Sequence, residues 1–278
     1  LHKEYRRQRQ MCIRDRGLRM KFASLGSGSE GNALLISTQS GTTRTTLMLD
    51  CGFAIKETER RLARLQMLPT DLSGIIVTHE HQDHVGGVFK FARRHKLPVW
   101  LTYGTYQAVH DKCDGVQLHF CRDSERFAIG DLELSPYTVP HDAREPVQYV
   151  ASDGARRLGV LTDAGHGTAH MIAALDACDA LMLECNHDRQ MLINSTYPPS
   201  LKQRIGGEYG HLSNHAAGEI LAALDKSRLQ RIVGAHLSLK NNTPELARAA
   251  LTGVVADSAE VMIACQEEGF GWVEVEHP

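Results

Sequence analysis

A histidine-rich stretch, Thr-His-Glu-His-Gln-Asp-His, occupies residues 78–84 and directly follows a short apolar run. The apolar run predicts a buried strand, and in extended backbone residues i and i+2 face the same way. His79 and His81 can therefore converge on one metal ion, while Asp83 and His84, at the start of a helix, can turn toward a second ion. Three histidines and one aspartate within six residues favour a metal site over a plain polar loop between strand and helix.

Short apolar runs bounded by Gly, Pro, Asp or Ser alternate with amphipathic segments along the whole chain, which predicts the α/β class with more than a single sheet. Strands are predicted at residues 21–25, 33–37, 46–50, 74–78, 98–102, 132–140, 147–152, 158–163, 180–184, 231–236 and 271–275. Helices are predicted at residues 54–67, 84–95, 103–110, 168–177, 213–225 and 243–255. No linker rich in Ser, Gly or Pro divides the chain, so we expect residues 20–278 to form one domain.

Three further predicted strands end on residue types that bind metals, namely His141, Asp163 and His236. A side chain at a strand end is held by rigid backbone, which a preorganised metal site requires. One such ending alone is weak, because a single histidine there is more often a hydrogen-bonded structural residue. Four endings in one chain, all imidazole or carboxylate, together favour a site for zinc or a similar ion.

These motifs resemble the successive motifs of the metallo-β-lactamase fold superfamily. The resemblance rests on HEHQDH at 79–84, Val-Pro-His141, Thr-Asp163-Ala-Gly, Ala-His236-Leu-Ser and, as an early strand-end aspartate, Leu-Asp50-Cys-Gly. Three other segments resemble the YycJ-type, or WalJ-type, branch: GSGSEGN at 26–32, GHLSN at 210–214 and HLSLKNNTP at 236–244. The resemblance implies an αββα four-layer sandwich of two mixed sheets flanked by helices, with metals at one sheet edge and nuclease activity on DNA.

Carried over residue by residue, the resemblance implies two divalent ions, Zn or Mn. It assigns one ion to His79, His81 and His141, the other to Asp83, His84 and His236, with Asp163 bridging them. A hydroxide that bridges two such ions attacks phosphorus or a carbonyl carbon near neutral pH. Asp83 is also expected to orient this nucleophile.

Several other polar residues are candidates for supporting roles. His211 is expected to donate a proton to the leaving alkoxide or, alternatively, to replace His236 as the last ligand. We favour His236 because it ends an apolar strand. Asp50 is interpreted as a hydrogen-bonding partner behind the histidine loop. The segment 184–188 closes another apolar strand and is interpreted as cleft wall or as support behind the ligands.

The glycine-rich loop admits two interpretations. Its Ser27, Ser29 and Asn32 are expected to support the ligands or to meet phosphate oxygens of the substrate. The pattern GxGxxG at 26–31, with an aspartate nearly 20 residues on, would instead indicate a dinucleotide-binding oxidoreductase. That pattern is meaningful only where it opens a helix, and residues 33–37 have the pattern of a strand, so we reject the second interpretation.

The charge of the chain is unevenly distributed. Of 31 Lys and Arg and 33 Asp and Glu, seven basic and two acidic residues lie within 1–19, which leaves 24 basic against 31 acidic residues for the rest. Residues 11–16 resemble translated sequencing-adapter sequence, so we expect 1–19 to be a disordered or non-native tail. The acidic remainder argues against extensive contact with duplex DNA, although two metal ions add about four positive charges at the cleft.

The sequence therefore favours a binuclear metal-dependent hydrolase, a phosphodiesterase or DNA exonuclease. The alternative is a small-molecule hydrolase that cleaves a thioester, lactone or lactam with the same metals. A non-catalytic metal-binding scaffold is disfavoured because every ligand position is filled. The seven cysteines include no CxxC pair, and no signal peptide is recognised, which predicts a cytoplasmic protein. No apolar run approaches the roughly 18–20 residues that span a bilayer, so we expect no membrane partner.

Overall fold

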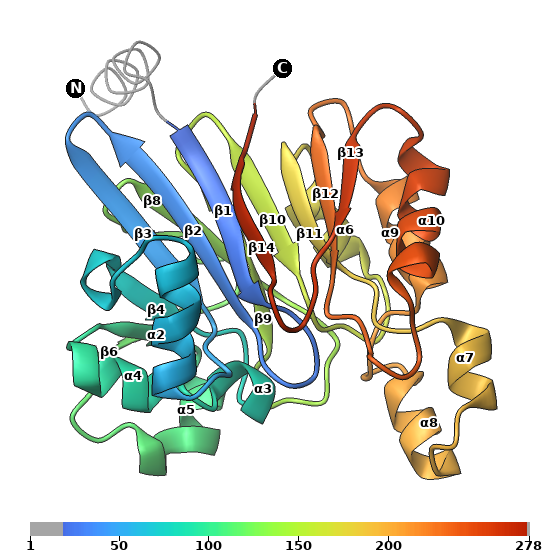
Figure 1. Cartoon of the computed structure of the whole chain (residues 1–278), viewed down its shortest axis with the longest axis horizontal. Helices are drawn as coiled ribbons and strands as arrows, with labels where there is room; N and C mark the ends of the chain where they lie inside the picture. The colour runs from blue at the N-terminus through green and yellow to red at the C-terminus, as the bar shows by residue number, and fades with distance from the viewer. Residues whose placement is uncertain (1–18, 277–278) are drawn as a thin grey trace.

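Two seven-stranded sheets form the centre of the computed structural model, which describes residues 19–276. In Figure 1, α2 (Ile55–Arg64) and α4 (Val88–His95) flank the first sheet, and α9 (Asn214–Ala223) and α10 (Pro244–Val255) flank the second. The predicted αββα four-layer sandwich is confirmed. The prediction that residues 20–278 form one domain stays a prediction.

The first sheet has the strand order β14-β1-β2-β3-β4-β5-β6. Its strands are β14 (Phe270–Glu274), β1 (Arg19–Gly26), β2 (Ala33–Ser40), β3 (Thr43–Leu49), β4 (Gly74–Ile76), β5 (Val99–Leu101) and β6 (Leu118–Phe120). The pairs from β14 to β3 are antiparallel, whereas β3, β4, β5 and β6 run parallel to one another. The carboxyl ends of β3 to β6 therefore meet at one edge.

The second sheet has the order β13-β12-β11-β10-β9-β8-β7. Its strands are β13 (Glu260–Ile263), β12 (Arg231–Ala235), β11 (Ala180–Glu184), β10 (Arg157–Leu161), β9 (Val147–Ser152), β8 (Leu132–Thr138) and β7 (Phe127–Ile129). Strands β10 to β13 are parallel, so the residues after β10, β11 and β12 also share an edge.

Apolar side chains of both sheets fill the space between them. Phe22 and Ile36 of the first sheet pack in one buried cluster with Leu134, Tyr149 and Val160 of the second. Two further clusters join the outer faces of the sheets to the helices. Within residues 19–276 the other helices are α3 (Gln82–Val85), α5 (Tyr103–Val109), α6 (Ala169–Leu175), α7 (Arg189–Asn194), α8 (Pro199–Ile205) and the 3-10 turns η1 (Pro69–Asp71) and η2 (His110–Lys112).

The structure corrects the predicted elements in three places. The helix predicted at 84–95 is divided into α3 and α4 at Gly86 and Gly87, where the backbone of Gly87 passes so close to Phe53 that a β-carbon would lie 1.9 Å from the Phe53 carbonyl oxygen. Strands β6, β7 and β13 are three or four residues long and were not predicted. Helices α7 and α8 were also not predicted, because neither carries enough apolar periodicity.

The strand after the glycine-rich loop is confirmed as β2, which rules out a helix at that position. Residues 1–18 of the predicted tail lie outside the described residues, and Arg19 is the first residue of β1 rather than part of a tail. Within residues 19–276, no helix combines the length and apolar character needed to cross a membrane. The predicted cytoplasmic location stays a prediction.

Arg61 on α2 connects this helix to the first sheet through hydrogen bonds. Its Nη1 donates to the carbonyl oxygens of Leu25 at 2.6 Å and Gln266 at 3.0 Å, while its Nε donates to Glu57 at 2.6 Å. Only 7% of Arg61 is exposed. Hydrogen bonds from Arg60 and Arg61 lower the pKa of Glu57 to about 2, so the pair stays charged across the neutral and mildly acidic range.

We expect Arg61→Met to lower the free energy of unfolding by about 1–3 kcal/mol, because methionine keeps the aliphatic stem but leaves buried carbonyl groups without this donor. Urea titration followed by circular dichroism measures the loss. Arg60→Met is the matched control: its side chain is 59% exposed and pairs with the same glutamate, so we expect a change within about 0.5 kcal/mol. Equal losses in the two variants would contradict a special role for Arg61.

Candidate metal centre

The histidine loop continues β4 and is held from behind by the end of β3. Asp50 adopts a left-handed backbone conformation with φ 60° directly after β3, a conformation that a non-glycine residue keeps only when its surroundings fix it. Asp50 Oδ1 accepts from the Thr78 backbone N–H and Oδ2 accepts from the Thr78 hydroxyl, both at 2.8 Å. Asp50 Oδ2 also accepts from His84 Nδ1 at 2.8 Å, so one buried carboxylate orients both ends of the loop.

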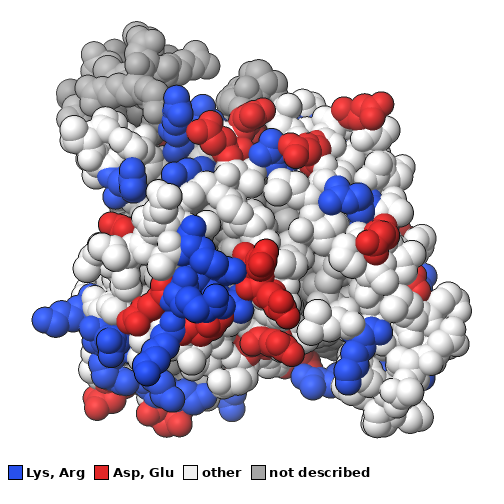
Figure 2. Space-filling view, viewed as in Figure 1, with Lys and Arg blue, Asp and Glu red and all other residues white. Residues whose placement is uncertain are grey.

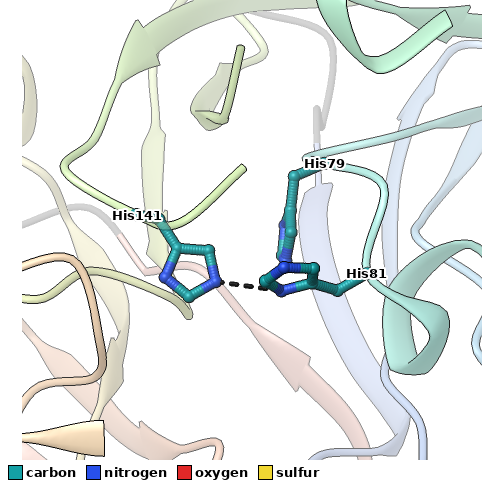
Figure 3. Close-up of side chains that lie close together, drawn as sticks. All are labelled: His79, His81 and His141. Atoms are coloured by element: carbon teal, nitrogen blue, oxygen red, sulfur yellow. Dashed lines mark hydrogen bonds between the residues drawn. The ribbon is translucent and has the colours of Figure 1, made fainter. Parts of the chain in front are cut away.

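His79, His81 and His141 form the first group of ligand atoms. Figure 3 shows that the His79 and His81 rings come from the loop after β4 while His141 approaches from a different segment, the one after β8. The dashed line joins His81 Nδ1 and His141 Nε2, which lie 3.1 Å apart. One ligand atom from each of the three residues lies within 4.8 Å of the others.

The outward-facing nitrogen of each ring has an acceptor of its own. The Thr78 hydroxyl donates its proton to Asp50, so its oxygen accepts from His79 Nδ1 at 2.9 Å. His141 Nδ1 donates to the Gly210 carbonyl oxygen at 2.9 Å, and His81 Nε2 donates to the carbonyl oxygen of Asp142 at 3.2 Å. The three nitrogens that face one another are thereby left with their lone pairs, as in histidines that bind a metal.

Asp83, His84 and His236 form the second group, beside the first. Asp83 Oδ2 lies 3.4 Å from His84 Nε2 and 3.3 Å from His236 Nε2. His84 Nδ1 donates a hydrogen bond to Asp50 Oδ2, and His236 Nδ1 donates to Glu184 Oε1 at 3.2 Å. The Nε2 atoms of both rings therefore face the carboxylate. His236 has φ 55° directly after β12, so it shares the left-handed conformation of Asp50.

Asp163, 1% exposed, lies between the two groups. Its Oδ2 is 3.1 Å from His84 Nε2, and its Oδ1 is 3.9 Å from His141 Nε2 and 3.5 Å from His236 Nδ1. The carboxylate thus touches a ring from each group, which is the position that a bridging ligand occupies.

The donor atoms fit a cation. Among the described residues His79 Nε2 is buried without a hydrogen-bond partner, although an unsatisfied buried nitrogen is costly. His81 Nδ1 and His141 Nε2 face one another 3.1 Å apart, so a cation beside them could be bound by both rings. Imidazole nitrogens together with carboxylate oxygens are the ligands that zinc and manganese use in hydrolases.

The pKa values of the buried groups also favour a bound cation. Burial lowers the pKa of His79 well below its usual value, so this ring is neutral at neutral pH, the form that binds a metal. Burial also opposes charge on His211 and His236, but Glu184 raises the pKa of His211 to about 10 and Asp163 raises that of His236 to about 9. The carboxylates therefore draw positive charge into this region, which a cation satisfies.

The centre opens into a cavity of about 380 Å³. His81, Asp83, Asp163 and His236 lie on its floor, and Ser29 and Ser238 line it from the loops after β1 and β12. The segment between β11 and α9 supplies another wall, formed by Tyr197, Leu201, Arg204 and Ile205. Arg204 Nε donates to Asp142 Oδ2 at 2.7 Å, which links α8 to the His141 loop across the cavity.

Residues 45–236 match the family profile of the β-lactamase superfamily domain. The chain belongs to the β-lactamase superfamily. It is 34% identical to exodeoxyribonuclease YycJ of Bacillus anthracis over 255 residues, which cover 91% of each chain. It is 32% identical to exodeoxyribonuclease WalJ of Streptococcus pneumoniae, with 86% of this chain and 89% of WalJ covered. The predicted resemblance to the superfamily and to its YycJ/WalJ-type branch is confirmed.

The fold agrees with this membership. The metallo-β-lactamase fold protein YhfI from Bacillus subtilis superposes with a TM-score of 0.71 at 18% identity, over 92% of this chain and 99% of that chain. As a member of the superfamily with groups of side chains suited to metal ions, the chain is a metal-dependent hydrolase.

The sequence predicts only a general role for Glu184 as cleft wall or support, but the structure shows specific contacts for it. It ends β11, between the strands that carry Asp163 and His236, and is completely buried. Its Oε1 accepts from His211 Nδ1 at 2.8 Å and from His236 Nδ1 at 3.2 Å. Its Oε2 accepts from the backbone N–H groups of Leu212 and Ala164. The available signal was the glutamate at the carboxyl end of a central parallel strand.

His211 stands at the rim of the second group rather than within it. Its Nδ1 is held by Glu184 and lies 3.3 Å from Asp163 Oδ1, and its side chain is 24% exposed. It borders the cavity of the metal centre. Sequence reasoning missed Arg204 and Asp142 on the cavity wall, since no motif marks either of them.

The glycine-rich loop contacts the second group directly. Ser27 Oγ accepts from the backbone N–H of His236 at 2.9 Å. Asn32 Nδ2 donates to Asp83 Oδ2 at 3.3 Å and lies 3.2 Å from His84 Nε2. Both residues are buried, whereas Ser29 is exposed and lines the cavity. Ser27 and Asn32 therefore contact residues of the second group, and of the three only Ser29 lines the cavity.

Proposed function

We propose that the chain is a binuclear metal-dependent phosphodiesterase, a DNA exonuclease that uses two divalent ions. The observation that carries the proposal is the meeting of two mostly buried groups of ligand atoms at one carboxylate, Asp163. The relatives YycJ and WalJ are exodeoxyribonucleases by name and align over most of the chain, which supports DNA as the substrate.

Seven residues would hold the ions. His79, His81 and His141 would bind one, Asp83, His84 and His236 the other, and Asp163 both. The chemistry supplied by two such ions when bound is the activation of water near neutral pH and the neutralisation of charge on the phosphoryl oxygens.

Asp83 and His211 act on the substrate side of this arrangement. Asp83 turns Oδ2 toward His84 and His236, so we assign its Oδ1 to orient the attacking water. His211 Nδ1 is held by Glu184, so Nε2 is the atom that donates a proton to the leaving alkoxide. We assign Ser29, which lines the cavity, to contact with a phosphate oxygen.

The surface charge favours a DNA end over a long duplex. Figure 2 shows the face of the molecule that is turned to the viewer in Figure 1. Near its middle lies a group of Lys and Arg side chains with Asp and Glu side chains beside them, so this face carries no uniform basic field. Binding of long duplexes usually relies on many phosphate contacts by Lys and Arg. An exonuclease needs to hold only a terminus close to its metal centre.

The test compares substrates for the protein loaded with zinc or with manganese. We expect stepwise shortening of linear DNA labelled at one end, slow hydrolysis of bis(p-nitrophenyl) phosphate and no cleavage of covalently closed circular DNA. EDTA is expected to abolish both activities. Hydrolysis of a thioester or a β-lactam without any cleavage of phosphodiesters would refute the proposal and favour the small-molecule hydrolase.

A further inference from the structure

Three aromatic side chains lie together on the surface at the ends of β5 and β6. Tyr103 is 55% exposed, Phe120 is 54% exposed and Tyr106 is partly exposed. The ring centroids of Tyr103 and Phe120 are 5.6 Å apart, those of Tyr106 and Phe120 5.4 Å, and those of Tyr103 and Tyr106 5.8 Å. We call these three residues the aromatic patch. Large apolar side chains grouped in the open usually mark a binding surface.

The aromatic patch shares its sheet edge with the metal centre. The histidine loop follows β4, Tyr103 follows β5 and Phe120 ends β6, and these three strands are parallel neighbours. Since neighbouring strands are spaced about 4.8 Å apart, the patch begins roughly 5–10 Å along the edge from the loop. This span corresponds to about two or three stacked nucleotides.

Direct contacts connect the two places. Thr102, the residue before the patch, donates its hydroxyl to the Glu145 carbonyl oxygen at 2.9 Å, and the backbone N–H of Gly104 donates to the Glu145 carboxylate at 2.6 Å. The neighbouring Arg144 donates its backbone N–H to Glu80 at 2.7 Å, between His79 and His81. The loop that carries His141 thus connects the metal centre with the patch.

One exposed arginine lies along this connection, and a second follows the patch in sequence. Arg144 is exposed between the His141 loop and α5, where its Nη1 is 3.5 Å from the side-chain oxygen of Gln107. Arg122 follows Phe120 by two residues, has a side chain that is 76% exposed and approaches Glu125 only to 4.0 Å. Exposed aromatic rings with guanidinium groups alongside are the combination that holds single-stranded nucleic acid, by base stacking and phosphate contact.

We infer that the aromatic patch binds the bases of single-stranded DNA adjacent to the nucleotide that is being hydrolysed. This inference rests on the proposed nuclease function and adds a second binding region to it. Tyr103 and Phe120 stack on bases, Tyr106 supports both rings, and Arg122 and Arg144 contact the phosphates. Stacking needs no particular base, so the site accepts any sequence.

The test measures binding and turnover separately. Metal-loaded protein is titrated into a fluorescein-labelled, phosphorothioate-linked oligothymidine of about 20 nucleotides, and the dissociation constant is read from fluorescence anisotropy. Tyr103→Ala and Phe120→Ala are each expected to raise it at least about 5-fold, and Phe120→Trp to retain tight binding. Hydrolysis of bis(p-nitrophenyl) phosphate, which reaches the metal centre without the patch, is expected to be unchanged in all three variants.

Leu68→Ala is the matched control, because this side chain is 65% exposed and lies outside the patch. A double Tyr103→Ala/Phe120→Ala variant that binds the oligonucleotide as tightly as the parent overturns the inference. Loss of self-association in that variant, with unchanged oligonucleotide binding, overturns it too and assigns the patch to a protein contact. If the parent cleaves linear DNA in either case, the proposed function stands and only the patch has been misassigned.

Discussion

Replacement of Asp163 by asparagine is expected to lower phosphodiester hydrolysis by roughly 10³-fold or more. Among residues 19–276, Asp163 is the one carboxylate that contacts a ring from each ligand group, through His84 and His141. An amide keeps the shape of the side chain but removes the negative charge that, in the proposed centre, would hold two cations close together. Metal ions contribute several kcal/mol of charge stabilisation in such reactions, which corresponds to the stated loss.

Two measurements check this expectation. Turnover of bis(p-nitrophenyl) phosphate gives the activity, and elemental analysis of the dialysed protein gives the metal content, which we expect to fall from about two ions per chain to one or none. Asp179→Asn is the matched control. Asp179 is equally buried, but it precedes β11 at the opposite end of the same sheet, where it pairs with Arg228 at 2.9 Å.

The control variant is expected to be less stable while keeping its metal and its turnover per folded molecule. If Asp163→Asn retained two ions and near-normal turnover, Asp163 would not bridge the metals. If both variants lost metal to the same extent, the loss would reflect general destabilisation of this sheet rather than a missing ligand.

Glu184→Gln is expected to lower the turnover number about 10- to 100-fold, with little change in KM for bis(p-nitrophenyl) phosphate. The carboxylate accepts from His211 and His236 through a single oxygen. A glutamine can present either its oxygen or its amide group there, so it cannot hold both rings and also accept from the backbone of Leu212 and Ala164. Loss of a partner that orients metal-binding histidines usually costs an effect of this size.

A double-mutant cycle with His211→Ala separates positioning from simple destabilisation. If Glu184 acts by orienting His211, the two changes together cost much less than the sum of their separate costs. His211→Ala alone is expected to retain both metal ions, because we assign His211 to proton donation. Fully additive losses would remove the link between the two residues, and loss of an ion from His211→Ala would make His211 a ligand in place of His236.

The positions of the core strands were predictable because each combines a run of apolar residues with a clear boundary. Strands β9 and β11 coincide with the predicted ranges 147–152 and 180–184. Strands β6, β7 and β13 at the sheet margins were not predicted, although β4 and β5 are equally short and were. Helices α7 and α8 were not predicted because they bury few of their side chains against the body of the chain. Of these two helices, α8 carries residues of the cavity wall.

The sequence by itself determined which residue types are available and how they are presented locally. The stretch 78–84 places His79 and His81 on one side because extended backbone repeats every two residues. His141, Asp163 and His236 were recognisable because each follows an apolar strand. These properties depend only on nearby residues in the sequence, so they can be predicted without knowing which residues are neighbours in space.

Only the tertiary structure decided which of these residues meet. The approach of His81 to His141 depends on the packing of one sheet on the other. The place of Glu184 behind His211 and His236 depends on β11 lying between β10 and β12. The order of strands is set by long-range burial of their faces, which no local periodicity encodes, and the aromatic patch arises in the same way from the pairing of β5 with β6.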